Sequence, residues 1–284
     1  MTLWAPFSKE ELKQAIAKCS NSLAPGPDKL LWQYLKFIIK QDECLSNIIN
    51  VANACINLGH WPEWSSTIII PKPNKSLYNH AKMFCPIVLL NMLGKLIEKV
   101  IAERIQFTVL KNNFIYPCQL GGLKFKSTTD AGVALTHIMR SGWAKGKTTS
   151  TLAFDISQFF PSLNYNLLTT ILSKVGFEPK VSRFFVDYLV QRKTNYIWNS
   201  LQSPDFEVNI GIEQGSALSP ILSALYLTPF LHILEKHLKN LKIPISMLSF
   251  VDDRIIITQN NSILISNSCC RLKTLVLVPR LNLV

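Results

Sequence analysis

The feature that most constrains this chain is a pair of adjacent acidic residues, Asp252 and Asp253, set between two apolar runs within residues 249–258. Apolar runs of strand length on either side of a short polar stretch predict a β-hairpin, with the polar residues at its tip. Neighbouring carboxylates held there repel one another and need a counterion. A simpler interpretation is an ordinary polar turn, since Asp often caps local backbone groups in hairpins.

A third acidic residue, Asp155, ends another short apolar run within residues 152–157. If this run and residues 249–258 form neighbouring strands, the three carboxylates converge. Hard divalent cations such as Mg²⁺ take carboxylate ligands together with substrate phosphate oxygens, and a pair of such ions suits phosphoryl transfer. The sequence therefore predicts a metal site made by Asp155, Asp252 and Asp253.

A glycine-containing loop lies between the two acidic segments. Residues 211–222 include Gln214 and Gly215 and run into an apolar helix, for which Ser219 is the predicted N-cap and Pro220 the first helical residue. Glycine permits close backbone approach, and a glutamine amide can hydrogen-bond bases or sugars. The loop is therefore a candidate nucleotide contact, the alternative being a connection that only precedes a helix.

These three segments, in this order, resemble the reverse transcriptases of non-LTR (LINE-type) retrotransposons. That family has an Asp followed five residues later by an aromatic residue, here Asp155 and Phe160. It also has a Gln-Gly-Ser/Thr-x-Leu-Ser-Pro loop and an aromatic-x-Asp-Asp hairpin. Further matches lie at residues 24–28, 70–75, 86–100 and 127–131, so the resemblance covers nearly the whole chain.

The resemblance implies an RNA-directed DNA polymerase, which adds deoxynucleotides to a primer and releases pyrophosphate. Its expected partners are an RNA template, a DNA primer and dNTPs, and its expected cofactors are two Mg²⁺ ions, with Mn²⁺ as an alternative. The implied fold is α+β, a right-hand polymerase with an antiparallel palm sheet and packed helices. We expect fingers at residues 1–147, a palm at 148–258, and an atypical tail at 259–284 that is truncated or frame-shifted, so that the thumb is missing.

The resemblance also implies roles for single residues. Asp155 and Asp252 are the expected core metal ligands, and Asp253 assists them. Phe160 is expected under the sugar of the incoming nucleotide, where its ring would exclude a 2′-hydroxyl; the alternative is a core aromatic residue. Basic residues are expected to contact the nucleotide triphosphate (Lys72, Lys75) or the template (Lys124, Lys126, Arg192, Lys193), the alternative being solvated surface charges.

The composition supports an anionic partner. The chain has 284 residues, a formal net charge of +12 and 48% hydrophobic residues, which favours a folded nucleic-acid-binding protein, although solubility alone can explain a basic surface. The seven cysteines are scattered, no pair has the two-residue gap typical of zinc ligands, and they are expected to be reduced. Neither a signal peptide nor a membrane-spanning run is found, which predicts a soluble intracellular protein, nuclear if it acts at genomic targets.

Two departures from the family leave other functions open. Cys85 stands where the family has an Arg before Pro-Ile, and a thiol supplies neither charge nor paired donors. The tail after residue 258 does not resemble the family's continuation. One alternative is therefore a catalytically inactive retroelement relic that binds nucleic acid through its basic surface. Another is the related maturase or RNA-dependent RNA polymerase group, although Phe160 and the Leu-Ser-Pro loop argue against the latter.

Local patterns also predict individual elements. Ser8 and Glu11 form a capping-box pattern that opens a helix, and residues 94–110 and 128–142 have helical character. β-Branched residues at 65–70 predict a strand that stops at Pro71. The remaining predictions are helices at 31–39 and 48–56, a turn at 161–164, helices up to residue 189, and a short strand at 195–198.

Overall fold

The computed structural model describes residues 3–61, 64–190, 192–240 and 245–261. Packing divides the chain into two compact units, and each unit is discontinuous in sequence. The first unit comprises residues 1–108 and 160–219, and the second comprises 109–159 and 220–284. Both contain helices and strands, which confirms the α+β class. The predicted fingers and palm ranges follow the family and not this packing, so they stay predictions; residues 262–284 of the predicted tail lie outside the described residues.

Several helices of the first unit begin or end with a local signal that is visible in the sequence. In α1 (Lys9–Ala17), Ser8 Oγ accepts from the Glu11 amide at 3.2 Å, and the Ser8 amide donates to Glu11 Oε2 at 2.9 Å, which confirms the predicted capping box. A left-handed glycine, Gly59, ends α3 (Asp42–Leu58). The other helices here are α2 (Trp32–Ile38), α3 (Asp42–Leu58), α4 (Met92–Lys111), α7 (Tyr165–Val175) and α8 (Pro179–Leu189), and they confirm the predicted helices.

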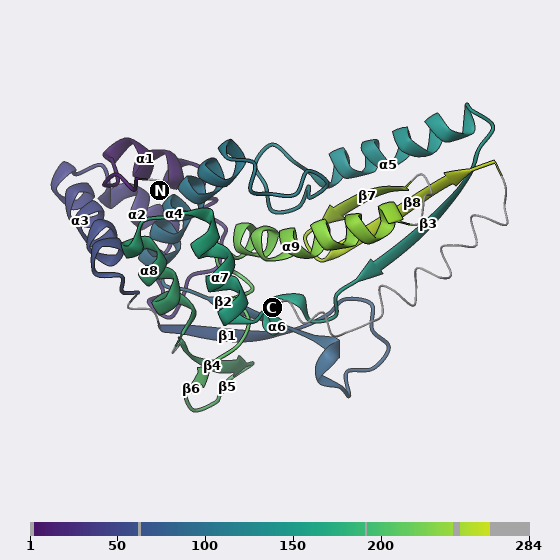
Figure 1. Ribbon diagram of the computed structural model, residues 1–284. Helices are drawn as coiled ribbons and strands as arrows, with labels where there is room; N and C mark the ends of the chain where they lie inside the picture. The colour runs from purple at the N-terminus through teal and green to yellow at the C-terminus, as the bar shows by residue number, and fades with distance from the viewer. Residues whose placement is uncertain (1–2, 62–63, 191, 241–244, 262–284) are drawn as a thin grey trace. The chain divides into compact units, whose positions relative to one another are not determined.

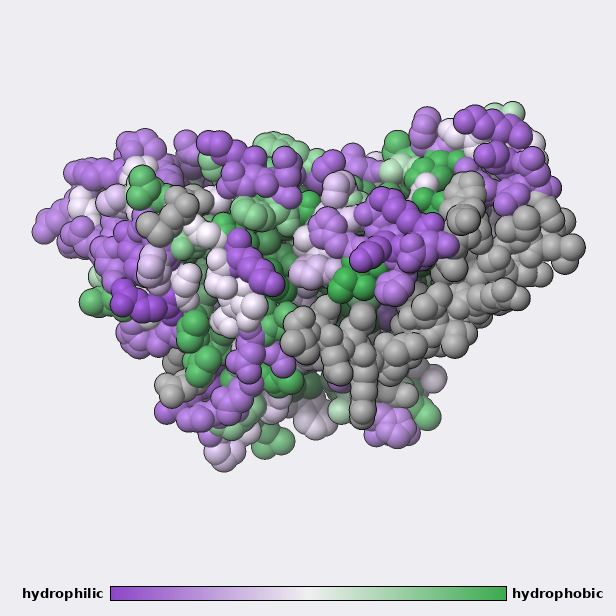
Figure 2. Space-filling model, viewed as in Figure 1, coloured by the Kyte–Doolittle hydropathy of each residue, from purple (hydrophilic) through white to green (hydrophobic). Residues whose placement is uncertain are grey.

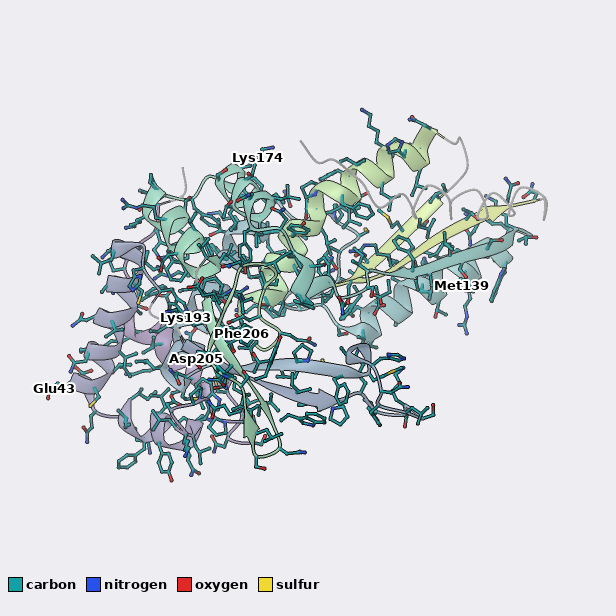
Figure 3. The ribbon with its side chains drawn as sticks, turned by 90° about the horizontal axis from the view of Figure 1, so that it is seen from below. Glu43, Met139, Lys174, Lys193, Asp205 and Phe206 are labelled. Carbon is teal, nitrogen blue, oxygen red and sulfur yellow. The ribbon has the colours of Figure 1, made fainter. Side chains whose placement is uncertain are left out.

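A mixed sheet completes the first unit, and its strand order is β2-β1-β4-β5 with β6 also paired to β4. The strands β1 and β4 are parallel, whereas the other pairs are antiparallel. The strand β4 begins at Arg192, which pairs with Val208, and this is three residues before the start of the predicted strand. Figure 3 labels Lys193, Asp205 and Phe206, which lie close to this pair in the sequence. The strands are β1 (Trp64–Pro71), β2 (Phe84–Leu89), β4 (Arg192–Trp198), β5 (Leu201–Gln202) and β6 (Phe206–Val208), with a 3-10 turn η1 (Ala81–Met83) before β2.

The prediction of a turn at residues 161–164 is wrong in its first half. A short helix, α6 (Phe159–Ser162), contains Pro161, since proline fits the first turn of a helix where its missing N–H is not needed. The following two residues, 163 and 164, connect α6 to α7. Asn164 then caps α7, with its Oδ1 accepting from the Leu167 amide at 3.1 Å.

The second unit is built on a three-stranded antiparallel sheet with the order β3-β8-β7. Its strands are β3 (Thr148–Asp155), β7 (Ile245–Phe250) and β8 (Asp253–Asn260), and the helices α5 (Thr128–Trp143) and α9 (Ser219–Asn240) lie beside them (Figure 1). Leu234 and Leu238 of α9 pack against Ile256 of β8 and Phe154 of β3. This apolar cluster fixes which face of the sheet is covered.

The helix α9 includes Ser219, so it begins one residue before the predicted first helical residue. The Ser219 hydroxyl donates to the Glu213 carbonyl at 2.6 Å, which ties the preceding loop to the helix start.

Figure 2 shows hydrophilic residues predominating over α1 and α3 on the visible face. Among the helices that the structure describes, none is long and apolar enough to cross a membrane.

Candidate active site

The three predicted acidic residues come together at one end of the β3-β8-β7 sheet. Asp155 is the last residue of β3 and lies directly opposite Asp253, the first residue of β8. Val251 and Asp252 form the two-residue connection between β7 and β8. These observations confirm the predicted hairpin and the predicted neighbouring strands. Because opposite residues of antiparallel strands have Cβ atoms about 4.5–5.5 Å apart, Asp155 and Asp253 share one face of the sheet.

The strand alternation places these acids away from the apolar cluster. Leu152 and Phe154 of β3 pack against the α9 cluster, whereas Asp155, next along the strand, is exposed on the opposite face. Asp253 is also exposed, and Asp252 is half-buried. Burial, together with the negative charges of Asp155 and Asp253, raises the pKa of the Asp252 carboxyl above its ordinary value. Asp252 thus lies beside two like charges, which disfavour its ionised form.

The turn that carries Asp252 has an unusual backbone. Val251 has a φ of 53°, and a β-branched residue in this left-handed region costs of order 1–3 kcal/mol unless its surroundings enforce it. The segment beside the turn supplies that enforcement: Gln119 Oε1 accepts from the Val251 amide at 3.2 Å, and the Leu120 amide donates to the Ser249 carbonyl at 2.8 Å. A β-carbon at Gly121 would overlap the Val251 backbone nitrogen. Sequence reasoning missed this support.

A buried arginine, Arg254, holds the same turn from inside the unit. Its Nη1 donates to the Asp252 carbonyl at 2.9 Å and its Nη2 to the Val251 carbonyl at 3.4 Å. The guanidinium also lies 5.5 Å from the centre of the Phe230 ring. Burial lowers the pKa of the Arg254 guanidinium to about 10. Because side chains alternate between the two faces of a strand, an exposed Asp253 predicts that Arg254 faces inward. Sequence reasoning did not use this signal.

The acidic cluster fits a divalent cation by its chemistry. Carboxylate oxygens are the ligands that Mg²⁺ prefers, and a cation would offset the charges that raise the pKa of Asp252. Within the described ranges, no three His, Cys, Asp or Glu side chains are already grouped so as to hold a metal ion.

Three of the candidate nucleotide residues, Phe160, Gln214 and Gly215, are fixed by backbone contacts within the first unit. The Phe160 carbonyl accepts from the Ile212 amide at 2.8 Å, and the Gln214 carbonyl accepts from the Val88 amide at 2.8 Å. Gly215 has a φ of 132°, and a β-carbon there would overlap the Val88 carbonyl oxygen. The loop therefore packs against β2, and only glycine fits at this position.

Cys85, the residue that departs from the family, reaches the same loop. Its Sγ lies 3.5 Å from Gln214 Oε1. Gln214 also lines a partly open pocket, walled by side chains that include Pro86, Pro161 and Ile212. The thiol thus contacts the candidate nucleotide residue, although it carries no charge for a phosphate.

The basic residues predicted for nucleic-acid contacts divide into exposed and buried ones. Lys72, Lys75 and Lys193 of the first unit are exposed, as are Lys124 and Lys126 of the second. Arg192 is only 8% exposed. Its Nη2 donates to the Ile210 and Gly211 carbonyls at 3.2 and 2.6 Å and to the Tyr165 hydroxyl. A template contact by Arg192 does not fit this burial, and the side chain supports the loop before Gln214 instead.

A carboxylate that sequence reasoning missed, Glu98 of α4, also contacts this loop. It is fully buried and accepts a hydrogen bond from Ser216 Oγ at 2.8 Å. The only sequence signal was an acidic residue between the apolar positions of a buried helix.

The fold and the site define an α+β protein with a carboxylate cluster suited to divalent cations. The family model described as Reverse transcriptase (RNA-dependent DNA polymerase) matches residues 70–275, and the chain belongs to this family.

Its relatives are proteins of mobile elements. The chain is 24% identical over 229 residues to the RNA-directed DNA polymerase from mobile element jockey of Drosophila funebris, covering 78% of this chain and 24% of that protein. It is 27% identical over 224 residues to the probable RNA-directed DNA polymerase from transposon X-element of Drosophila melanogaster, with the same coverage, 78% and 24%. The Pol polyprotein of the type-2 retrotransposable element R2DM of Drosophila melanogaster is 23% identical, covering 83% of this chain and 21% of that protein. The chain thus spans about a quarter of the length of these relatives.

Proposed function

We propose that this chain carries the catalytic core of an RNA-directed DNA polymerase, which adds deoxynucleotides to a primer on an RNA template and releases pyrophosphate. The observation that carries the proposal is the pairing of Asp155 with Asp253 across β3 and β8, with Asp252 beside them. Relatives named as RNA-directed DNA polymerases support the choice of reaction. In this proposal residues 1–147 correspond to fingers and residues 148–258 to a palm.

Asp155 and Asp252 would act as the principal ligands of two Mg²⁺ or Mn²⁺ ions, with Asp253 assisting. When bound, such ions favour ionisation of a primer 3′-hydroxyl and neutralise charge on the α-phosphate. The chain's own contribution is to hold the acids in place. Arg254 and the Gln119 amide oxygen fix the turn around Asp252, so the carboxylates are preorganised before any substrate arrives.

The first unit would select the nucleotide. The half-buried Phe160 ring would pack under the sugar and exclude a 2′-hydroxyl by overlap. The loop of Gln214 and Gly215 would form the floor under the nascent base pair, because its backbone comes close to β2 and leaves no space for a side chain. Lys72 and Lys75, both exposed, would contact the triphosphate.

The template would lie against exposed basic residues. Lys124 and Lys126 flank Phe125, whose side chain is 96% exposed. A positive groove with aromatic side chains is how proteins bind single strands without sequence preference, because every base offers a face for stacking. Lys193 would add a further phosphate contact in the first unit, and Arg192, being buried, is left out of the template contacts.

Primer extension on an RNA template, with and without Mg²⁺, tests the proposal. The wild-type chain should extend the primer only with the divalent cation, and Asp252→Asn should abolish extension. A matched control is Glu43→Gln, an exposed acid at the start of α3 (Figure 3), which should extend normally. Nucleic-acid binding without extension in the wild type would contradict the polymerase proposal and favour the inactive, nucleic-acid-binding alternative.

A further inference from the structure

A buried carboxylate on α4 is bonded to the loop that carries Gln214 and Gly215. Glu98 has 0% exposure. Its Oε1 accepts from the Tyr188 hydroxyl at 2.7 Å, and its Oε2 accepts from Ser216 Oγ at 2.8 Å and from the Ala217 amide at 3.0 Å. The Tyr188 and Ser216 hydroxyls also lie 2.8 Å apart. One carboxylate thus accepts hydrogen bonds from Ser216 and Ala217, the two residues that directly follow Gln214 and Gly215.

The helix that bears Glu98 is itself fixed at its start. Asp28 Oδ2 accepts from the Met92 amide at 2.7 Å, and the Asp28 amide donates to Asn91 Oδ1 at 3.1 Å. A β-carbon at Gly26 would overlap the Leu90 carbonyl, so this close approach requires glycine. Gly26 and Asp28, within the family-matched residues 24–28, therefore fix the start of α4.

The electrostatic surroundings of Glu98 are unusual. A second buried carboxylate, Glu213, immediately precedes Gln214, and Arg192 Nη1 lies 3.8 Å from Glu213 Oε1. Burial, with the charge of Glu213 adding to it, raises the pKa of the Glu98 carboxyl to about 7. Burial also raises the pKa of Glu213, which Arg192 opposes. The titratable and charged groups around Glu98 are thus Tyr188 of α8, Glu213 before α9, and, through Glu213, Arg192 of β4.

We propose that Glu98 is a positioning residue that sets the backbone geometry of Gln214 and Gly215 and, through it, the affinity for the incoming nucleotide. The effect on nucleotide affinity rests on the proposed function, whereas the effect of Glu98 on the loop geometry does not. If the loop moved away from α4, the buried Glu98 carboxylate and its donors on Ser216 and Ala217 would lose their hydrogen bonds without gaining water. This cost holds the loop and α4 in one arrangement.

The geometry also gives the loop a pH response. Because the pKa of Glu98 is higher in the folded chain than its ordinary value of 4.5, the folded form binds more protons between that value and about 7. The stability of the ordered network therefore falls as pH rises through this window and is constant above it. Glutamine at position 98 imitates the protonated acid, since its oxygen can accept from Ser216 and Ala217 while its NH₂ group donates to Tyr188.

Amide hydrogen exchange tests the structural part without requiring activity. In Glu98→Ala the protection factor of the Ala217 amide should fall at least tenfold, and in Glu98→Gln it should stay near wild type and lose its difference between pH 6 and pH 8. The matched control is Glu103→Gln on the same helix, whose carboxylate pairs with Lys18 at 2.7 Å, and it should behave as wild type. If Glu98→Ala does not fold, Tyr188→Phe removes one donor and should lower the same protection factor. Wild-type protection in the folded variant would overturn the proposal.

Steady-state kinetics tests the consequence for the nucleotide. Tyr188→Phe and Glu98→Ala should raise KM for dNTP at least tenfold with a smaller change in kcat, whereas Glu98→Gln should keep KM and lose its pH dependence. An unchanged KM in a folded variant that has lost Ala217 protection would overturn the link to nucleotide affinity. If the wild type extends no primer, the proposed function fails, and the exchange result alone decides the structural role of Glu98.

Discussion

Asp155 lies directly opposite Asp253 across the antiparallel pairing of β3 and β8. Both side chains are exposed on the face away from the Leu234 and Ile256 cluster, and the half-buried Asp252 is next to them in the turn. Like charges so placed oppose folding and favour a bound cation, which links the stability of this unit to its proposed chemistry.

The first prediction concerns Asp155→Asn and Asp252→Asn. Each should lower primer extension by about a thousandfold or more, because a neutral amide is a poor ligand for Mg²⁺. Since the pKa of Asp252 is raised in the folded chain, its ionised form destabilises the fold as pH rises, and Asp252→Asn should have an equal or higher Tm at neutral pH. Extension rates and thermal unfolding at pH 5.5 and 7.5 check both effects; a markedly lower Tm would contradict the like-charge interpretation.

The second prediction concerns the sugar. If the Phe160 ring excludes the 2′-hydroxyl, Phe160→Ala should incorporate ribonucleotides at least tenfold better relative to deoxynucleotides. Phe160→Tyr keeps the bulk of the ring and should retain the wild-type preference. The measurement is kcat/KM for one rNTP and its dNTP on the same template. An unchanged ratio in an active Phe160→Ala would return Phe160 to the role of a core aromatic residue.

The third prediction concerns template binding by the exposed segment at residues 124–126. Phe125→Ala should weaken binding of a single-stranded RNA by about 1–3 kcal/mol with little change in salt dependence, because stacking carries no charge. Lys126→Gln should instead reduce the slope of log Kd against log salt by roughly 0.7. Fluorescence anisotropy between 50 and 300 mM salt separates the two. Identical behaviour of wild type and Phe125→Ala would argue against stacking.

The fourth prediction concerns the support of the catalytic turn. Gly121→Ala should destabilise the chain by about 1–3 kcal/mol, since the new methyl group meets the backbone at Val251 and must displace the turn. The matched control is Gly132→Ala in the exposed part of α5, where nothing lies within 4 Å; it should stabilise by about 1 kcal/mol through helix propensity. Urea unfolding measures both, and a neutral Gly121→Ala would show that the turn can relax.

The sequence by itself determined the elements whose causes lie within a few residues. Ser8 and Glu11 satisfy each other across one helical turn, and the apolar runs around Asp252 form a hairpin because a two-residue turn is all that the connection needs. The same local reasoning failed at Pro161, where a helical first turn is as compatible with proline as a bend. Family motifs, in turn, named the three acids without any spatial information.

Only the tertiary structure decided which distant groups meet. The pairing of Asp155 with Asp253, the burial of Arg192 and the seating of Glu98 beneath the loop at 216–217 join residues far apart in the chain. The burial of a side chain and the identity of its hydrogen-bond partners depend on how the elements pack. The sequence around a lysine or arginine is the same whether its side chain is exposed to solvent or lies beside a buried carboxylate. The physical reason is that desolvation and charge pairing act through space, whereas propensity and capping act along the chain.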